Sequence, residues 1–567
     1  MIWIAKDHPP KEAITTLQQE LQIPSVNAHL LIQRGLSSFD SAKTYFRPKA
    51  DQLHDPFLMD GMQKAVQRIE KALSAGEKIL IYGDYDVDGT TAVALLYTYL
   101  SNFSDRVKTY IPDRYKEGYG ISFQGIDYAE QEGFQLMIAL DCGIKALEQV
   151  AYAKQKGIDF IIGDHHKPGS ELPEAYAILN PKKEQCPYPY KELCGCGIAF
   201  KLVQGIHQQR QGEWSEILPL LDLVVTATAA DIVPLTGENR TLAALGLQQF
   251  QQAARPGLQA LMGERKKPYR ISDVVFGVAP RINAAGRMEH ARIAVELLTS
   301  AKAEEGLHIA QRIEQFNQDR RSVEQQITQE ALDQIIENQE EKRTTTVVFH
   351  KDWHKGVIGI VASRLIEKYY RPTVVCCLSG DTIVASVRSV RGFDVYQALE
   401  ACSEHLLQFG GHKYAAGLSL HPSKFEDFKN HFEKIVANQI LPEQQLPQLT
   451  YDLDVSFDML TPKVYRIIQQ MRPFGPGNMR PVFLTRGCTN AGFTRLVGQD
   501  KTHLKLDATD ASGRRFSGIG FGLATAWEKL QNQSFDLIYC LEENTFNDRT
   551  TLELQVKDIR PSQAQNS

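Results

Sequence analysis

The chain is 567 residues long, with 43% hydrophobic and 23% charged residues, a composition typical of a large globular protein with several packed units. Its formal net charge is -5, so no overall positive field points to a nucleic-acid partner, and any such binding must use a local patch. No uninterrupted apolar run reaches the roughly 20 residues of a membrane span, which excludes a membrane protein.

The N-terminus and the cysteines predict a cytoplasmic protein. The first residues lack the basic region and apolar core of a secretory signal. The nine cysteines are sparse and odd in number, which argues against a disulfide framework. The close pairs Cys194/Cys196 and Cys376/Cys377 lack the two-residue gap of cysteine zinc sites, so they are not expected to bind structural zinc.

After an N-terminal extension at residues 1–50, residues 51–300 are predicted to form an α/β domain. Short apolar runs alternate there with helical patterns, which indicates a largely parallel sheet. The predicted strands are residues 79–82, 107–111, 136–140 and 160–162. Polar residues follow each strand. Because the carboxyl ends of parallel strands share one edge of the sheet, we expect these residues to converge in space.

Residues 301–340 are predicted to form one long helix, because apolar residues recur at three- or four-residue steps in a polar stretch. Sustained heptads are missing, which favours a bridge between two domains over a coiled coil. A smaller α/β domain is predicted at residues 341–440, with strands at 346–349 and 373–377 flanking a helix near 357–370. Residues 441–567 show alternating strand patterns and are predicted to form a small β-barrel.

Three carboxylates, Asp84, Asp86 and Asp88, alternate directly after the first predicted strand. This spacing suits hard divalent cations. It also matches the first half of an EF-hand loop, but position twelve is Leu95 and a strand precedes the loop, which excludes that calcium site. Capping of the next helix is the alternative role, although three carboxylates there would repel one another without a cation.

Further candidate ligands follow the later strands. Asp141 follows the third strand, and Asp164, His165 and His166 follow the fourth, while Asp231 lies in an apolar segment where an unpaired charge is costly. Adjacent histidines alone are as often structural as ligating. Their expected convergence with the aspartates indicates a site for two Mn²⁺ or Mg²⁺ ions bridged by a carboxylate, and such a pair supports phosphoester hydrolysis.

Candidate phosphate-binding groups occur in both α/β domains. Arginine binds phosphate through a planar fork, although most surface arginines have no specific ligand. Residues 410–417 are rich in Gly and Ala, which allows either close backbone approach to a phosphate or an ordinary loop. The basic cluster at residues 265–267 is interpreted as a solvated loop, with nucleic-acid contact as the alternative. The candidate cations are Arg114, Lys116, Arg281, Arg287 and Arg388.

Several motifs, in order along the chain, resemble the DHH/DHHA1 phosphoesterase family. They are residues 84–89, 141–143, 164–166, 281–287, 353–360, 410–412 and 473–475. The resemblance covers nearly the whole chain, and the full set looks like the family's single-stranded-DNA-specific 5′→3′ exonucleases. It implies a parallel-sheet DHH catalytic domain, joined by the long helix to an α/β DHHA1 domain, and a C-terminal OB-fold. It also implies a central channel too narrow for duplex DNA.

The resemblance also implies a role for each matching residue. The metal ligands would be Asp84, Asp86, Asp88, Asp141, His165 and Asp231. The catalytic residues would be Asp141, His166 and Asp88, with His166 at the scissile phosphate. The substrate-binding residues would be Arg114, Ser386 and Arg388 near the 5′ end, Arg281 and His412 along the DNA backbone, and Asn283.

The implied reaction is degradation of single-stranded DNA to mononucleotides in DNA repair and recombination, with two Mn²⁺ or Mg²⁺ ions. A helicase and a single-strand-binding protein would supply the substrate, and an internal channel makes a monomer sufficient. Departures from the family pattern are Tyr82 in place of a metal-binding His, Ala385 and Val387 beside the Ser-Arg pair, and Cys196 in place of Ala. The alternatives are a hydrolase of short oligonucleotides, disfavoured by the extra β domain, and a non-catalytic single-strand-binding scaffold, disfavoured by the intact carboxylates.

Overall fold

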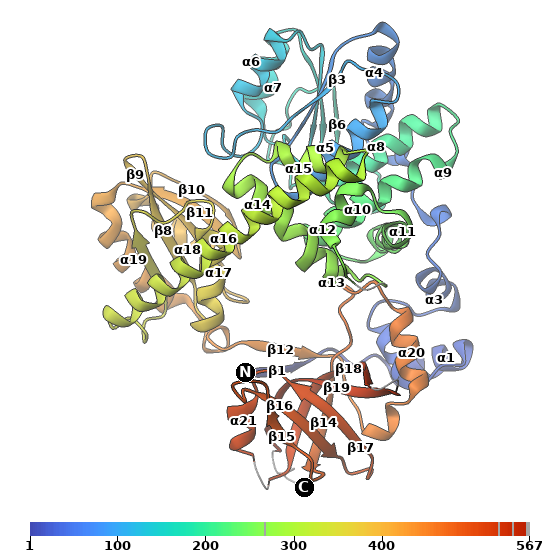
Figure 1. The fold of residues 1–567 in the computed structure, drawn as a ribbon, viewed down its shortest axis with the longest axis vertical. Coiled ribbons are helices and arrows are strands. Elements are labelled where there is room, and N and C mark those ends of the chain that lie inside the picture. The colour runs from blue at the N-terminus through green and yellow to red at the C-terminus, as the bar shows by residue number, and fades with distance from the viewer. Residues whose placement is uncertain (266–267, 531–532, 547–548, 563–567) are drawn as a thin grey trace. The chain divides into compact units, whose positions relative to one another are not determined.

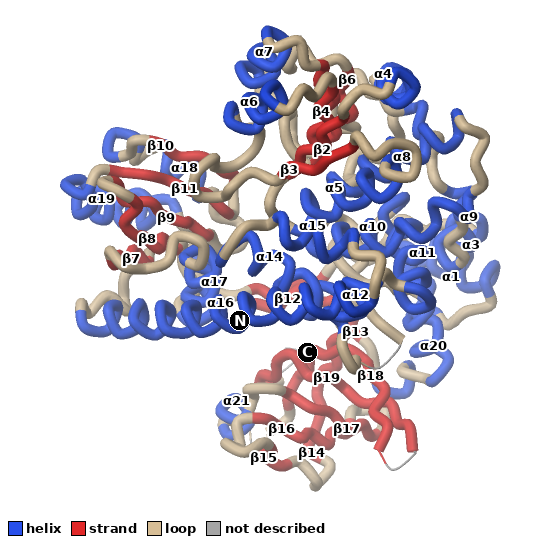
Figure 2. The backbone as a smooth tube through the Cα atoms, turned by 45° about the horizontal axis from the view of Figure 1, so that its top comes forward, coloured by secondary structure: helices blue, strands red, loops and turns tan. Residues whose placement is uncertain are grey.

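The computed structural model describes residues 1–265, 268–530, 533–546 and 549–562, and the chain divides into two compact units (Figures 1 and 2). The larger unit comprises Leu53–Val233 and Gly237–Pro447. The smaller unit comprises Met1–Gln52, Pro234–Thr236 and Gln448–Ser567. Every helix in the described ranges is too short or too polar to span a bilayer.

A five-stranded parallel sheet forms the centre of the first half of the larger unit. In the order β3-β2-β4-β5-β6, its strands are Val107–Tyr110, Ile79–Gly83, Leu136–Leu140, Asp159–Gly163 and Ala177–Leu179. All residues of β2 and β4 are buried, as in parallel sheets that are covered on both faces. The four predicted strands are confirmed; β6 was not predicted, because its three residues carry no periodic signal.

Helices cover both faces of this sheet (Figure 1). One face carries α4 (Met62–Ala75), α5 (Val87–Leu100) and α8 (Gly195–Gln209). The other carries α6 (Phe123–Gln131) and α7 (Leu147–Gln155). The next helices are α9 (Trp214–Ile217), α10 (Leu221–Ala230), α11 (Gly237–Ala253), α12 (Pro256–Met262), α13 (Ile271–Asp273), α14 (Ala279–Met288) and α15 (Arg292–Thr299).

The predicted long helix is α16, which runs over 35 residues from Ala303 to Glu337. It packs against α12, α14 and α15 in the first half of the unit and against α17 and β7 in the second half. Its buried residues include Ile313, Ile327 and Ile335, members of the apolar series in the sequence. The prediction that the helix bridges two α/β halves is therefore confirmed.

The second half of the larger unit contains a mixed sheet in the order β10-β11-β9-β8-β7. These strands are Gln408–His412, Ala415–Leu420, Thr382–Arg388, Thr373–Ser379 and Thr346–His350. Within this sheet only the β7–β8 pair is parallel. The accompanying helices are α17 (Ile358–Lys368), α18 (Val395–Glu400) and α19 (Phe425–Gln439). The two predicted strands and the helix between them are confirmed.

The smaller unit is a β-barrel with N-terminal helices. The seven strands of the barrel are β13 (Leu453–Asp454), β14 (Phe483–Asn490), β15 (Arg495–Val497), β16 (His503–Thr509), β17 (Arg515–Gly520), β18 (Phe535–Phe546) and β19 (Arg549–Pro561). The β14–β16 pairing closes the sheet, which confirms the predicted barrel. Two helices accompany the barrel strands, α20 (Pro462–Gln470) and α21 (Ala524–Glu528).

The N-terminal segment shares its core with this barrel. Strand β1 (Ile2–Ala5) pairs in parallel with β12 (Gln448–Tyr451). The following helices are α1 (Lys11–Leu21), α2 (Ser25–Ile32) and α3 (Phe39–Phe46). Leu17 and Leu31 belong to the same buried cluster as Phe457 and Phe483. Residues 1–50 are thus packed into the C-terminal unit, a pairing that local sequence patterns do not reveal.

A buried ion pair gives a test of how the larger unit is stabilised. The side chains of Lys201 on α8 and Glu238 on α11 are both 0% exposed, with Nζ and Oε1 3.1 Å apart. Tyr188 donates a hydrogen bond to the other Glu238 oxygen at 2.6 Å. Lys201→Met should leave an uncompensated buried carboxylate and lower the free energy of unfolding by about 3–5 kcal/mol in denaturant titrations. The exposed Lys154→Met should change it little, and equal effects of the two variants would refute this account.

Candidate metal centre and active site

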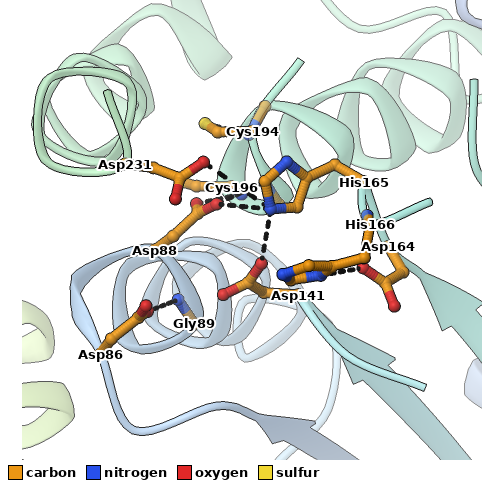
Figure 3. Close-up of polar contacts among 12 residues, drawn as sticks. Asp86, Asp88, Gly89, Asp141, Asp164, His165, His166, Cys194, Cys196 and Asp231 are labelled. Carbon is orange, nitrogen blue, oxygen red and sulfur yellow. Dashed lines mark hydrogen bonds and ion pairs between the residues drawn. The ribbon is translucent and has the colours of Figure 1, made fainter. Parts of the chain in front are cut away.

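Carboxylates and histidines from distant parts of the chain meet at the carboxyl edge of the first sheet (Figure 3). Asp84 directly follows β2, Asp141 follows β4, and His165 lies two residues after β5. The His165 Nε2 atom is 3.2 Å from Asp141 Oδ1, 3.7 Å from Asp231 Oδ2 and 3.8 Å from Asp88 Oδ2. The structure therefore brings together the residues that the strand pattern placed at one edge.

The donor atoms form overlapping groups in which all atoms lie within 4.8 Å of one another. These groups are Asp84/Asp86/Asp141, Asp88/His165/Asp231 and Asp141/His165/His166. Asp141 belongs to the first and third of these groups, and its Oδ1 lies 3.2 Å from His165 Nε2 of the second, which suits a carboxylate placed between two cations. Its φ of 60° is unusual for a residue other than Gly and directs the chain sharply at the end of β4.

Asp84, Asp88 and Asp141 are buried and Asp86 and Asp231 are half-buried, without sufficient neutralising charge nearby. Burial and the neighbouring Asp86 raise the pKa of Asp84 to about 8, and burial and Asp88 raise the pKa of Asp231 to about 8. Burial, followed by repulsion from Asp88, raises the pKa of Asp141 well above its usual value. The Oδ1 atoms of Asp84 and Asp141 are buried and make no hydrogen bond within the described part of the protein. An oxygen-rich set of this kind fits divalent cations.

These raised pKa values predict how the stability of the metal-free protein depends on pH. Acids with a higher pKa in the folded state hold protons that the unfolded chain releases, so stability should fall as pH rises from about 4 towards 8. Asp84→Asn should make this fall shallower, and Mn²⁺ should remove most of it. Thermal unfolding midpoints with chelator and with Mn²⁺ measure both effects. If, in chelator, the unfolding midpoint falls with pH equally steeply for wild type and Asp84→Asn, the prediction is contradicted.

Two of the acidic residues also make structural hydrogen bonds. Asp86 is the N-cap of α5, where its Oδ1 accepts from the Gly89 N–H at 3.0 Å, so the capping role applies to this residue. Asp88 accepts from the N–H groups of Gly195 and Cys196 at 2.6 and 2.7 Å, at the start of α8. The positive end of that helix therefore stabilises the charge of Asp88 inside the cluster.

Asp164 orients His166. The two side chains are joined by a bond of 2.7 Å between His166 Nδ1 and Asp164 Oδ1. Burial opposes charge on both groups, but this contact outweighs it, lowering the pKa of Asp164 and raising that of His166. On the other side of the ring, His166 Nε2 lies 3.2 Å from the Tyr119 hydroxyl. Tyr119 was not among the predicted site residues, although it lies in the loop after β3 and the same strand-end rule applies to it.

Three arginines converge near this edge. Burial, together with the nearby charges of Arg114 and Arg388, lowers the pKa of Arg287 to about 10. Arg114 lies over the ring of Tyr85, 4.5 Å from its centroid. Arg287 donates to the Gly356 carbonyl at 2.8 Å and so connects the two halves of the larger unit. Its partial burial, which the sequence cannot show, distinguishes it from a surface arginine.

The remaining predicted substrate-binding residues lie in three places. Ser386 and Arg388 lie together on β9, with Arg388 Nη1 3.2 Å from Ser386 Oγ, and a Cβ atom on Gly359 of α17 would be 2.9 Å from that oxygen. Arg281 on α14 forms an ion pair with Glu314, and Asn283 lies on the same helix. His412 is exposed on β10. Of the basic cluster at residues 265–267, Lys266 and Lys267 lie outside the described residues.

The close packing of α8 against the cluster allows a direct test. A Cβ atom on Gly195 would lie 2.6 Å from the Asp141 Cβ and 2.7 Å from its Oδ1. Gly195→Ala should therefore displace Asp141 and reduce metal-dependent activity by about tenfold, equivalent to about 1.4 kcal/mol in the barrier. Gly205→Ala in the same helix would meet only side-chain atoms of Val66 and Met62, at 3.2 Å or more and away from the carboxylate cluster, and should retain activity. Circular dichroism checks folding, and full activity of Gly195→Ala would refute the proposed contact.

Comparisons with known families cover three parts of the chain. Residues 78–228 match the DHH family, N-terminal domain; residues 340–438 match the DHHA1 domain; and residues 451–558 match the RecJ OB domain.

Full-length relatives and solved structures agree with these matches. The chain is 36% identical to the single-stranded-DNA-specific exonuclease RecJ of Bacillus subtilis, over 98% of this chain and 70% of that protein. It is 33% identical to the protein of the same name from Escherichia coli, over 89% of this chain and 91% of that protein. The crystal structure of RecJ in complex with Mn²⁺ from Thermus thermophilus is similar with a TM-score of 0.84 and 27% identity, over 99% of this chain and 80% of that one. The chain therefore belongs to the RecJ family of DHH phosphoesterases.

Proposed function

We propose that the chain is a two-metal-ion exonuclease that degrades single-stranded DNA from the 5′ end to mononucleotides, in DNA repair and recombination. The observation that carries this proposal is the meeting of buried aspartates with His165 at one sheet edge, where two carboxylate oxygens make no hydrogen bond to any described residue. The RecJ relatives, named as single-stranded-DNA-specific exonucleases, support the substrate. The intact donor set argues against a non-catalytic scaffold.

The donor groups suggest how the metal ligands divide. We assign Asp84, Asp86 and Asp141 to one Mn²⁺ or Mg²⁺ ion and Asp88, His165 and Asp231 to the other. Asp141 would be shared between them, because its Oδ1 lies 3.2 Å from His165 Nε2. When bound, the two ions activate water and neutralise the charge that develops on the phosphate. His166, oriented by Asp164, is assigned to donate a hydrogen bond from Nε2 to the scissile phosphate. Asp88 holds the start of α8 against the cluster and so fixes the catalytic edge.

The arginines supply a basis for recognising the 5′ end. Arg388 and Ser386 lie side by side near the start of α17, and Arg114 lies in the loop after β3. Arg287 connects the two halves of the unit through its hydrogen bond to Gly356. A terminal phosphate carries more negative charge than a diester, so a cluster of half-buried guanidinium groups favours it. Arg281, Asn283 and His412 are assigned to the DNA backbone. For Arg281, this contact competes with its ion pair to Glu314.

The proposed location is the cytoplasm. All nine cysteines are free and buried, as suits a reducing cytoplasm. A helicase and a single-strand-binding protein are proposed to supply the DNA strand. We also propose that the enzyme acts as a monomer, because the donor groups come from a single chain.

The function is tested with end-labelled single-stranded and duplex DNA in the presence of Mn²⁺, Mg²⁺ or chelator. The proposal predicts mononucleotides released from the 5′ end of single strands, only when a divalent cation is present. Release from 3′ ends, or activity in chelator, would overturn it. Cleavage restricted to short oligonucleotides would instead favour the alternative hydrolase.

A further inference from the structure

A second group of metal-binding side chains lies in the DHHA1 half of the larger unit, on elements other than those of the catalytic edge. Glu404 and His405 belong to the short turn Ser403–His405, between α18 and β10. His431 lies in α19, which packs against this turn. The two imidazole rings are 5.3 Å apart between centroids and nearly perpendicular, at 86°. The three ligand atoms lie within 4.8 Å of one another.

The distances among these atoms match those of a tetrahedral metal site. His405 Nε2 is 3.1 Å from His431 Nδ1, His431 Nδ1 is 3.4 Å from Glu404 Oε1, and the same oxygen is 3.7 Å from His405 Nε2. Nitrogen and oxygen donors bound to Zn²⁺ at about 2.0–2.1 Å in tetrahedral geometry are roughly 3.3–3.4 Å apart. The triangle therefore has the size that one such ion requires.

Hydrogen bonding alone does not satisfy all three atoms. Each imidazole nitrogen offers a single proton or a single lone pair in the plane of its ring. His431 Nδ1 faces both His405 Nε2 and Glu404 Oε1, so a hydrogen bond with one leaves the other atom without a partner inside the triangle. A cation at the centre of the triangle binds all three lone pairs at once.

We infer that Glu404, His405 and His431 bind one transition-metal ion of the Zn²⁺ class. Two imidazoles and one carboxylate favour Zn²⁺, Co²⁺ or Ni²⁺, whereas the oxygen-rich catalytic cluster favours Mn²⁺ and Mg²⁺. The side chain of His405 is 14% exposed, that of His431 30% and that of Glu404 70%, so a dissolved ion reaches the site and water completes its coordination. The exposed position also allows the site to load in the folded protein.

Binding at this site would join two separate segments of the DHHA1 fold. The turn that carries Glu404 and His405 leads into β10, and β10 ends with His412, which is assigned to the DNA backbone. The ion would link this turn to α19 and so restrict the motion of the chain segment that leads into β10. The inference does not depend on the nuclease proposal, because it concerns a different donor set and a different class of ion.

The test is Zn²⁺ binding to the full-length protein in excess Mn²⁺, measured by isothermal titration calorimetry, with Co²⁺ absorption as a second readout. Wild type should bind one Zn²⁺ ion per chain in addition to its Mn²⁺ ions. With Co²⁺ it should give the strong visible band of four-coordinate Co²⁺. Glu404→Gln and His431→Gln should each weaken this binding at least tenfold. His308→Gln, which alters an exposed histidine of α16, should not. Because Glu404 is exposed, its replacement should leave the fold intact, which unchanged circular dichroism would verify.

The nuclease rate in Mn²⁺ should be unchanged in Glu404→Gln and His431→Gln, which separates this site from the catalytic one. Equal Zn²⁺ affinity and equal Co²⁺ absorption in wild type and both variants would overturn the inference. Loss of Zn²⁺ binding in His308→Gln to the same extent would also overturn it.

Discussion

Replacing Asp141 with Ala is expected to abolish turnover while single-stranded DNA still binds. Asp141 belongs to the donor group of one ion and its Oδ1 lies 3.2 Å from His165 in the group of the other, so as the bridging carboxylate its loss would remove a ligand from both ions. Loss of several kcal/mol of transition-state stabilisation corresponds to a fall in kcat of at least about 10³-fold. Single-turnover cleavage of 5′-labelled DNA measures the rate, and fluorescence anisotropy measures binding.

A matched control separates loss of the ligand from damage to the fold. Asp454→Ala removes an exposed aspartate of the smaller unit and should leave the rate unchanged. The metal-free Asp141→Ala protein should be at least as stable as wild type, because the change removes a repelling buried carboxylate. An Asp141→Ala enzyme with substantial activity would refute the bridging role.

Replacing Arg388 with Gln should weaken the preference for a phosphorylated 5′ end by roughly a hundredfold. Truncating one partner of a buried charge pair costs about 2–5 kcal/mol, and 1.4 kcal/mol corresponds to a factor of ten. Arg388 is half-buried beside Ser386, and burial lowers its pKa, so a phosphate is the counter-charge that this site lacks. The measurement is kcat/KM for strands with and without a 5′ phosphate.

Two further variants give this prediction its specificity. Arg388→Lys keeps the charge but loses the planar fork, so it should recover only part of the preference. Lys434→Gln removes an exposed charge from α19 of the same domain and should have no effect. An unchanged preference in Arg388→Gln would remove this residue from the 5′-end site.

The features that could be predicted from the sequence depend on local periodicity or on the rule that parallel strands share one carboxyl edge. The strands β2 to β5 and the helix α16 follow from repeating apolar positions, and the meeting of Asp84, Asp141 and His165 follows because parallel strands end at one edge. The chemistry of the metal centre was therefore accessible before the structure. Family resemblance supplied the direction of degradation and the preference for single strands.

Other features depend on contacts between residues that are far apart in the chain. The pairing of β1 with β12, the burial of Arg287 and the ion pair of Arg281 with Glu314 leave no local pattern in the sequence. The contact between His405 and His431 also leaves no local pattern, because 26 positions separate them and only the packing of a turn on α19 brings their nitrogens together. The role of Asp164 in orienting His166 likewise required the geometry of the turn after β5.

The central claim is that one edge of the parallel sheet holds two catalytic divalent ions. Anomalous diffraction at the manganese edge, from crystals grown with Mn²⁺, tests it most directly. The account predicts two peaks, one among Asp84, Asp86 and Asp141 and one among Asp88, His165 and Asp231. A single peak, or none within these two groups, would contradict it.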